Sequence, residues 1–185
     1  MKAIFIPGNG GGHTDKNWFP YLNTELRKLG IEIVAAKFPD PVLARRSYWI
    51  PFLERLGADE NTILIGHSSG ALAGMRYVET HSILGSILVG VCHTDLGLES
   101  ERLSGYYDEP WDWDAIKMNQ KWIAIFASMD DPFIPVDESR YVRDQLSATY
   151  FEFTDRGHFI TDHNPANREL PEAFEFLKSE TRKVH

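Results

Sequence analysis

The stretch best suited to chemistry is GHSSG, residues 66–70. It matches the pattern G-x-S-x-G and lies between an apolar run typical of a strand (61–66) and a pattern typical of a helix (69–81). There, Ser68 would occupy a tight turn that lifts its hydroxyl clear of a sheet, with glycines on both sides avoiding collisions across the turn. The pattern predicts that Ser68 is a nucleophile; the alternative is a tight strand-to-helix turn without chemistry.

A serine hydroxyl is a weak nucleophile and needs a general base, for which His158 is the first candidate. His158 lies in the loop directly after the strand-like residues 149–155. His163, further from the strand end, is the second candidate, and a surface histidine in a turn is the alternative. His67 is expected to pack or to support its neighbours, because its side chain should point away from that of Ser68.

A carboxylate should orient and stabilise the histidine from a neighbouring strand end. Asp130 and Asp131 follow the strand-like run 121–128. The spacing to Pro135, near a helix start, favours Asp131. Asp130 remains an alternative candidate for this acid. A further alternative is that both aspartates only form a turn and have no chemical role.

The loop PGNGGG, residues 7–12, follows the strand-like run 2–6 and brings backbone N–H groups together. It completes neither the P-loop pattern nor the dinucleotide pattern, so nucleotide phosphate is not the expected ligand. An oxyanion hole fits better, with one N–H from Ser69 and the other from an earlier strand–helix loop. In that loop Asn9 is the expected donor and Gly10 the second choice; a turn without catalytic use is the alternative.

Apolar runs typical of strands alternate along the chain with segments typical of helices. Strands are expected at residues 2–6, 31–36, 61–66, 84–91, 121–128 and 149–155. Helices are expected at 17–30, 41–56 with an interruption at Pro51, 69–81, 136–146 and 170–183. This alternation predicts an α/β fold: a mostly parallel sheet with helices on both faces and the ligand site at the carboxyl ends of the strands. All the candidate residues above fall at such ends.

Residues 95–113, between the fourth and fifth expected strands, are placed to form a short lid over Ser68. We predict a substrate pocket lined by aromatic residues of this segment and one residue of the glycine loop: Tyr106, Tyr107, Trp111, Trp113 and Gly10. Alternatively, the aromatic residues only pack the segment onto the body. A short lid favours small, soluble substrates over long lipids.

Composition narrows the class of protein. The 185 residues are expected to form one domain, 1–185, and 43% are hydrophobic. The net charge is −8 with scattered Lys and Arg, so neither nucleic acid nor a membrane is an expected partner. The single cysteine, Cys92, fits a buried, inert thiol in a reducing, cytoplasmic compartment. Without a Cys/His cluster, we expect no metal and no organic cofactor.

Several stretches together resemble one family: PGNGGG, FPDP, GHSSGA, MRYVETH, SGYY with PWDW, DDPFIP and GHF. They resemble the small serine hydrolases of the retinoblastoma-binding protein nine type, over residues 4–158. The resemblance implies a compact α/β-hydrolase fold with a reduced cap and a triad of Ser68, Asp131 and His158. In the segment proposed to dock into a retinoblastoma pocket, LGADE at residues 56–60, Ala58 replaces the motif cysteine. Pocket-protein binding is therefore not expected.

These expectations combine into a serine hydrolase that cleaves a small ester, thioester or amide, as a carboxylesterase or an aminopeptidase would. The reaction would pass through an acyl-enzyme on Ser68. The alternative from another class is a catalytically idle protein that keeps the fold as a protein-binding module.

Overall fold

Six parallel strands form one sheet in the computed structural model, which describes residues 1–183. The last two residues of the predicted domain lie outside this range. The strand order is β2-β1-β3-β4-β5-β6. In chain order the strands are β1 (Lys2–Ile6), β2 (Glu32–Val34), β3 (Thr62–His67), β4 (Gly85–Val89), β5 (Trp122–Ser128) and β6 (Thr149–Phe153). All five neighbouring pairs are parallel, as the continuous apolar runs predict.

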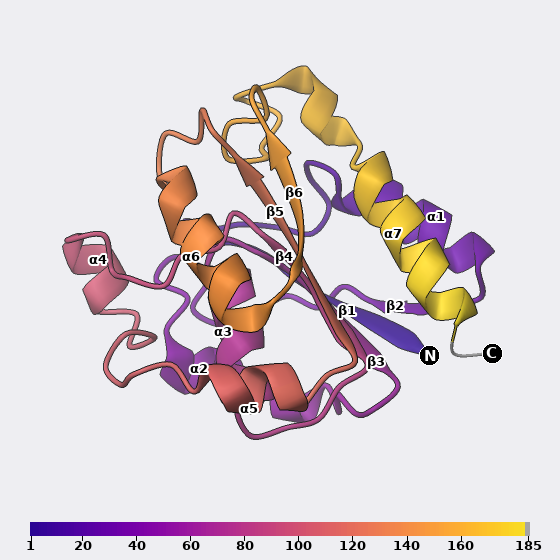
Figure 1. Ribbon diagram of the computed structural model, residues 1–185, viewed down its shortest axis with the longest axis horizontal. Coiled ribbons are helices and arrows are strands. Elements are labelled where there is room, and N and C mark those ends of the chain that lie inside the picture. The colour runs from indigo at the N-terminus through magenta and orange to yellow at the C-terminus, as the bar shows by residue number, and fades with distance from the viewer. Residues whose placement is uncertain (184–185) are drawn as a thin grey trace.

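Helices cover both faces of the sheet. They are α1 (Phe19–Lys28), α2 (Arg46–Arg55), α3 (Ser69–Val78), α4 (Glu99–Arg102), α5 (Trp113–Met118), α6 (Val136–Leu146), the 3₁₀ helix η1 (Pro165–Arg168) and α7 (Pro171–Arg182). Figure 1 shows α1 and α7 together on one side and α2, α3, α5 and α6 on the other. None of the helices in the described part of the chain has the length and apolarity needed to cross a bilayer.

Each face of the sheet has its own apolar core. Under α1 and α7, Phe5, Leu22 and Leu177 belong to one cluster of fully buried side chains. Under α2 and α3, Trp49 and Leu72 belong to the other. Side chains alternate along a strand, so a strand covered on both faces must be apolar at every position. This requirement explains the unbroken apolar runs in the sequence.

The helix expected at residues 41–56 begins later, at Arg46. Asp40 and Ala44 have positive φ angles of 49° and 53°, which a right-handed helix cannot include. The predicted interruption at Pro51 is wrong, because α2 continues through this residue. The buried side chains Trp49 and Leu53 hold the helix against the core despite the hydrogen bond that proline removes.

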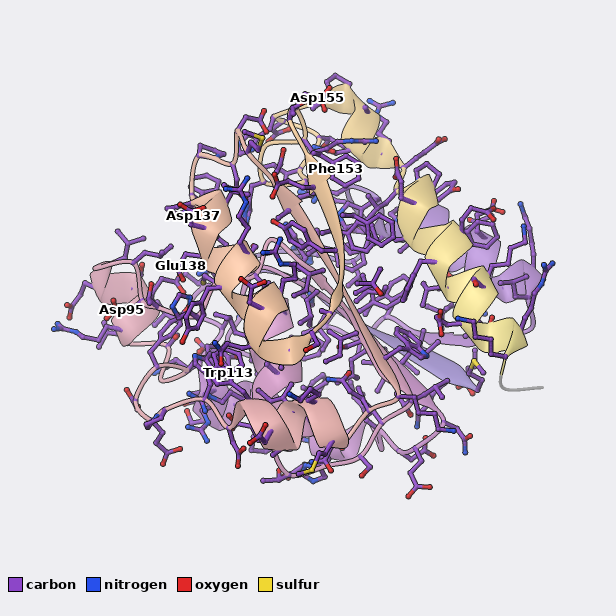
Figure 2. All side chains as sticks on the ribbon, viewed as in Figure 1. Asp95, Trp113, Asp137, Glu138, Phe153 and Asp155 are labelled. Atoms are coloured by element: carbon purple, nitrogen blue, oxygen red, sulfur yellow. The ribbon has the colours of Figure 1, made fainter. Side chains whose placement is uncertain are left out.

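The segment between β4 and β5 forms the reduced cap and is fastened to the body near both ends. At its start, the Glu138 carboxylate accepts hydrogen bonds from the backbone N–H groups of His93 (2.9 Å) and Thr94 (3.1 Å). Glu138 lies on α6, facing the stretch that contains Asp95 (Figure 2). Helix α5, which lies outside the predicted helices, ends the segment, with the Asp112 side chain accepting from the N–H of Ala115.

The second attachment is made by Arg76 of α3, whose side chain is 1% exposed. Its guanidinium donates to the backbone carbonyls of Tyr106 (2.6 Å), Glu109 (2.6 Å) and Pro110 (3.2 Å). The guanidinium carbon also lies 3.8 Å from the centre of the Trp111 ring. Residues 95–105, including α4, form the span between the two attachments.

Candidate active site

Ser68 stands at the turn between β3 and α3 with φ 53° and ψ −122°, a backbone conformation that non-glycine residues rarely adopt. The flanking glycines are required by close packing. A Cβ on Gly70 would lie 2.3 Å from the carbonyl oxygen of Ile6, and one on Gly66 would lie 2.5 Å from the carbonyl oxygen of Gly70. The strained strand–turn–helix geometry is that of a nucleophile elbow.

His158 pairs with Asp131. Its Nδ1 lies 2.7 Å from Oδ2 of Asp131, and the two side chains are 8% and 3% exposed. The other carboxylate oxygen of Asp131 accepts from the backbone N–H groups of Phe133 (2.9 Å) and Ile134 (3.1 Å). With Nδ1 engaged by the carboxylate, Nε2 is the imidazole nitrogen left to exchange a proton.

Gly90 connects the Ser68 turn to the imidazole of His158. The N–H of Ser68 donates to the carbonyl of Val89 at 2.8 Å. The next residue, Gly90, has a positive φ of 60°, and a Cβ there would lie 3.1 Å from Cε1 of His158. The imidazole therefore lies against Gly90, the residue that follows the acceptor of the Ser68 N–H. Both side chains line the same cavity.

The other two candidates support the loop that carries His158. Asp130 accepts from the N–H of Gly157 at 2.8 Å and from the Ser128 hydroxyl, so the structure pairs the histidine with Asp131. His163 accepts the backbone N–H of His158 on its Nδ1 at 3.0 Å and does not line the cavity.

His67 holds the same loop from the opposite side. Its Nε2 lies 2.8 Å from the carbonyl oxygen of His158, which requires the proton on Nε2. Burial lowers the pKa of His67 to about 3, with the nearby His158 adding to the effect, so the ring is neutral at physiological pH. The expectation that His67 supports its neighbours fits these contacts, but its side chain does not turn away from Ser68: both residues line the cavity, and a Cβ on Gly8 would lie 3.2 Å from Cβ of Ser68 and 3.3 Å from Nδ1 of His67.

The N–H of Asn9 is one of three in the glycine loop that are free at the cavity: within residues 1–183 those of Gly8 and Gly12 also lack a hydrogen-bond partner, and all three residues line the cavity. The loop's N–H groups at Gly10 and Gly11 donate to the carbonyls of Val42 (3.0 Å) and Pro41 (2.9 Å). Within residues 1–183, the N–H of Asn9 has no hydrogen-bond partner, and neither has that of Ser69 in the first turn of α3. The N–H of Gly10, the second candidate donor, is therefore already engaged in a hydrogen bond. Both Asn9 and Ser69 line the cavity.

The cavity has a volume of about 420 Å³, within the range of small-molecule sites. Besides Ser68 and His158, its walls are mostly apolar: Leu72, Leu96, Leu98, Phe133, Ile134 and Ile160. Cys92 also lines it, but burial raises the pKa of this thiol to about 12, in line with the expected inert cysteine. No group of three or more His, Cys, Asp or Glu side chains is arranged to hold a metal ion in residues 1–183.

The predicted substrate pocket is wrong in its residues. None of the five lines the cavity: Gly10, Tyr106, Tyr107, Trp111 and Trp113. Tyr106 is completely buried, and the carbonyl groups around it are bound by Arg76, so this half of the cap packs onto α3. The aromatic residues therefore serve mainly to attach the segment, which was the alternative interpretation.

The walls come instead from other residues of the predicted lid and from the segment after the aspartate pair. Leu96, Leu98 and Glu101 belong to the fastened span of the cap, and Phe133 follows the aspartate pair. Phe133 is 56% exposed, and its ring meets that of His158 edge-on at 5.2 Å. The signal that the sequence offers is an apolar residue in the turn two positions after the candidate acid.

The parallel sheet, the strained Ser68 turn and the histidine after β6 define an α/β hydrolase. The comparisons then give the family. The model of the family described as "Serine hydrolase" matches residues 3–179, and the chain belongs to this family.

Relatives agree with this assignment. The chain is 46% identical to the serine hydrolase RBBP9 of Rattus norvegicus over 181 residues, 96% of this chain and 94% of the relative. The structure of the ydeN gene product of Bacillus subtilis superposes with a TM-score of 0.87 at 26% identity, covering 98% of this chain and all of that one. Est1E of Butyrivibrio proteoclasticus shares the fold, with a TM-score of 0.75 at 15% identity over 98% of this chain and 89% of that one. The chain is therefore a serine hydrolase of the predicted type.

Proposed function

We propose that Ser68, His158 and Asp131 act as a catalytic triad. Nε2 of His158 takes the proton from the Ser68 hydroxyl as Oγ bonds to the substrate carbonyl carbon. The protonated imidazole then gives that proton to the leaving group, the bond to the leaving group breaks, and an acyl-enzyme remains. Water, activated by the same imidazole, cleaves the acyl-enzyme. Asp131 fixes the tautomer and balances the transient positive charge on the ring.

The N–H groups of Asn9 and Ser69 form the proposed oxyanion hole. Their lack of other partners supports this assignment, whereas Gly10 donates elsewhere. Donors held in place before the reaction stabilise the tetrahedral oxyanion without reorganisation, and loss of one typically costs about 10²–10³ in kcat. The N-terminal end of α3 adds a favourable dipole at the same position.

The proposed substrates are small esters, thioesters or amides with an apolar acyl group. Support comes from the modest cavity volume and from the aliphatic and aromatic walls around Ser68. The fastened cap leaves little room to accommodate a long lipid chain. A panel of aryl esters of increasing acyl length, run beside aminoacyl amides, tests this proposal: activity that rises without limit with chain length contradicts it.

The observation that carries the mechanism is the short contact between His158 and Asp131, with the imidazole lying against Gly90. Labelling with a fluorophosphonate is the direct test, because this reagent reacts with a serine activated by a base. We expect labelling of the native protein at Ser68 and none of the Ser68→Ala variant. The exposed Ser82, which lies outside the cavity, gives the matched control Ser82→Ala, which should label normally. A native protein that stays unlabelled favours an idle binding module.

We propose no retinoblastoma-pocket partner and a cytoplasmic location. Ala58 stands where the docking motif needs cysteine, and its carbonyl accepts from the Tyr77 hydroxyl at 3.2 Å. Leu56 and Ala58 also pack against the core, so the segment would have to leave the body to bind in an extended form. A pull-down with a purified pocket domain tests the first part; fractionation of cells tests the second.

A further inference from the structure

Glu101 of α4 reaches across the cavity to the glycine loop. Its Oε1 accepts a hydrogen bond from Nδ2 of Asn9 at 3.0 Å, across 92 residues of sequence. Its Oε2 lies 3.4 Å from the Tyr107 hydroxyl, which itself lies 3.1 Å from the Cys92 thiol. Both carboxylate oxygens therefore have partners, one in the glycine loop and one in the cap.

This contact occupies the part of the cap that is otherwise least attached. Glu138 fastens residues 93 and 94, and Arg76 fastens residues 106–110, so α4 lies between the two attachments. Within the described chain, the Asn9–Glu101 bond is the side-chain hydrogen bond that joins α4 to the glycine loop.

The glycine loop needs such a restraint. Gly10 and Gly11 have positive φ angles of 69° and 83°, and nothing lies within 4 Å of where their side chains would begin. The backbone there is free to change conformation, apart from the bonds to the 41–42 turn. Asn9, whose N–H has no partner, precedes both glycines directly. A fixed Asn9 side chain limits rotation of the peptide that carries this N–H.

We propose that Glu101 is a positioning residue for the oxyanion hole: by holding the Asn9 side chain, it aims the Asn9 N–H at the reacting carbonyl. The inference rests on the proposed role of Asn9 as an oxyanion donor. Through this bond the cap would affect the rate of the chemical step as well as the shape of the cavity. Glu101 need not touch the substrate for this effect.

The first test compares three variants by steady-state kinetics on an uncharged aryl ester. Glu101→Ala should lower kcat about 10- to 100-fold with little change in KM, a fraction of the loss expected for removing a donor completely. Glu101→Gln keeps an acceptor oxygen for Asn9 and should retain kcat within a few-fold. Glu99→Ala is the matched control, because Glu99 lies on the same helix and pairs only with the exposed Arg102.

A double-mutant cycle identifies the partner. If Glu101 acts through the Asn9 side chain, Asn9→Ala should lower kcat as Glu101→Ala does, and the double variant should be no worse than either single variant. Additive losses overturn the proposal. So does a Glu101→Gln variant that is as impaired as Glu101→Ala with a raised KM, because the carboxylate charge would then be binding substrate.

A charge exchange keeps the test decisive if Glu101→Ala does not fold. Asn9→Asp places two carboxylates against each other and should lower kcat strongly. Combining it with Glu101→Gln supplies an amide that donates to the carboxylate introduced at position 9 and should restore most of kcat. Failure to restore activity in a folded double variant overturns the proposal. Fluorophosphonate labelling of the native protein tests the triad separately. If Ser68 is labelled but the Glu101 variants keep the native kcat, the positioning role of Glu101 is refuted and the triad stands.

Discussion

His67 should make the stability of the protein depend on pH in a way that a single substitution removes. The ring is buried, and its pKa falls from 6.5 to about 3 on folding. Between these two values the unfolded chain binds a proton at this site and the folded protein does not. Stability therefore rises with pH across this window, and the contribution is lost as the pH falls below 6.5.

The size of the effect follows from the shift. Each pKa unit corresponds to 1.36 kcal/mol, so acidification from pH 7 to pH 5 should cost about 2 kcal/mol through His67 alone. Protonation would also place a cation next to His158, whose ring centre lies 4.8 Å away. The cost therefore comes from desolvation first and from charge repulsion second.

Urea unfolding at half-unit steps between pH 4.5 and 7.5, followed by tryptophan fluorescence, measures the dependence. In the His67→Gln variant the free energy of unfolding should fall about 2 kcal/mol less between pH 7 and pH 5 than in the native protein. The difference between the two slopes isolates His67 from the other histidines. Parallel curves for the native protein and His67→Gln would refute the reasoning.

Four further substitutions test other parts of the structure. Asp131→Asn should lower kcat by about 10³–10⁴, because His158 loses the carboxylate that fixes its tautomer. Asp130→Asn should lower kcat far less. Equal losses of kcat in a steady-state assay would contradict the pairing of His158 with Asp131. Gly90→Ala should lower kcat about 10-fold or more and also lower Tm, because the added methyl lies 3.1 Å from the His158 ring and alanine is strained at this positive φ; an unchanged kcat would show that the ring does not need this site. Arg76→Met should reduce the free energy of unfolding by on the order of 3 kcal/mol, since it leaves three backbone carbonyls of the cap unbonded; a urea midpoint equal to that of the native protein would contradict this role.

The sheet and the strand-end residues follow from local patterns in the sequence. A strand buried on both faces must be apolar throughout, and the Ser68 turn needs glycine where Gly66 and Gly70 stand, so both features are visible in a few consecutive residues. The choice of Asp131 over Asp130 is harder, because both follow the same strand. The contacts with His158 and Gly157 that separate them come from a loop 27 residues further on.

The cavity walls could not be predicted in the same way. An aromatic residue such as Tyr106 has the same appearance in sequence whether it lines a pocket or fills a core, and here the position of Arg76 on α3 decides that it is buried. The start of α2 was also misjudged. The positive φ at Ala44 arises in a turn where Asp40 accepts from the backbone N–H of Arg45, a local alternative that competes with helix formation.

The two attachments of the cap make residues 95–105 a replaceable module. Glu138 and Arg76 bind main-chain atoms on either side of this stretch, so they hold whatever side chains the intervening residues carry. A loop of other composition grafted between these two points would need to keep the Glu101 carboxylate that binds Asn9, while its other side chains can change. Engineering of a new selectivity should begin there.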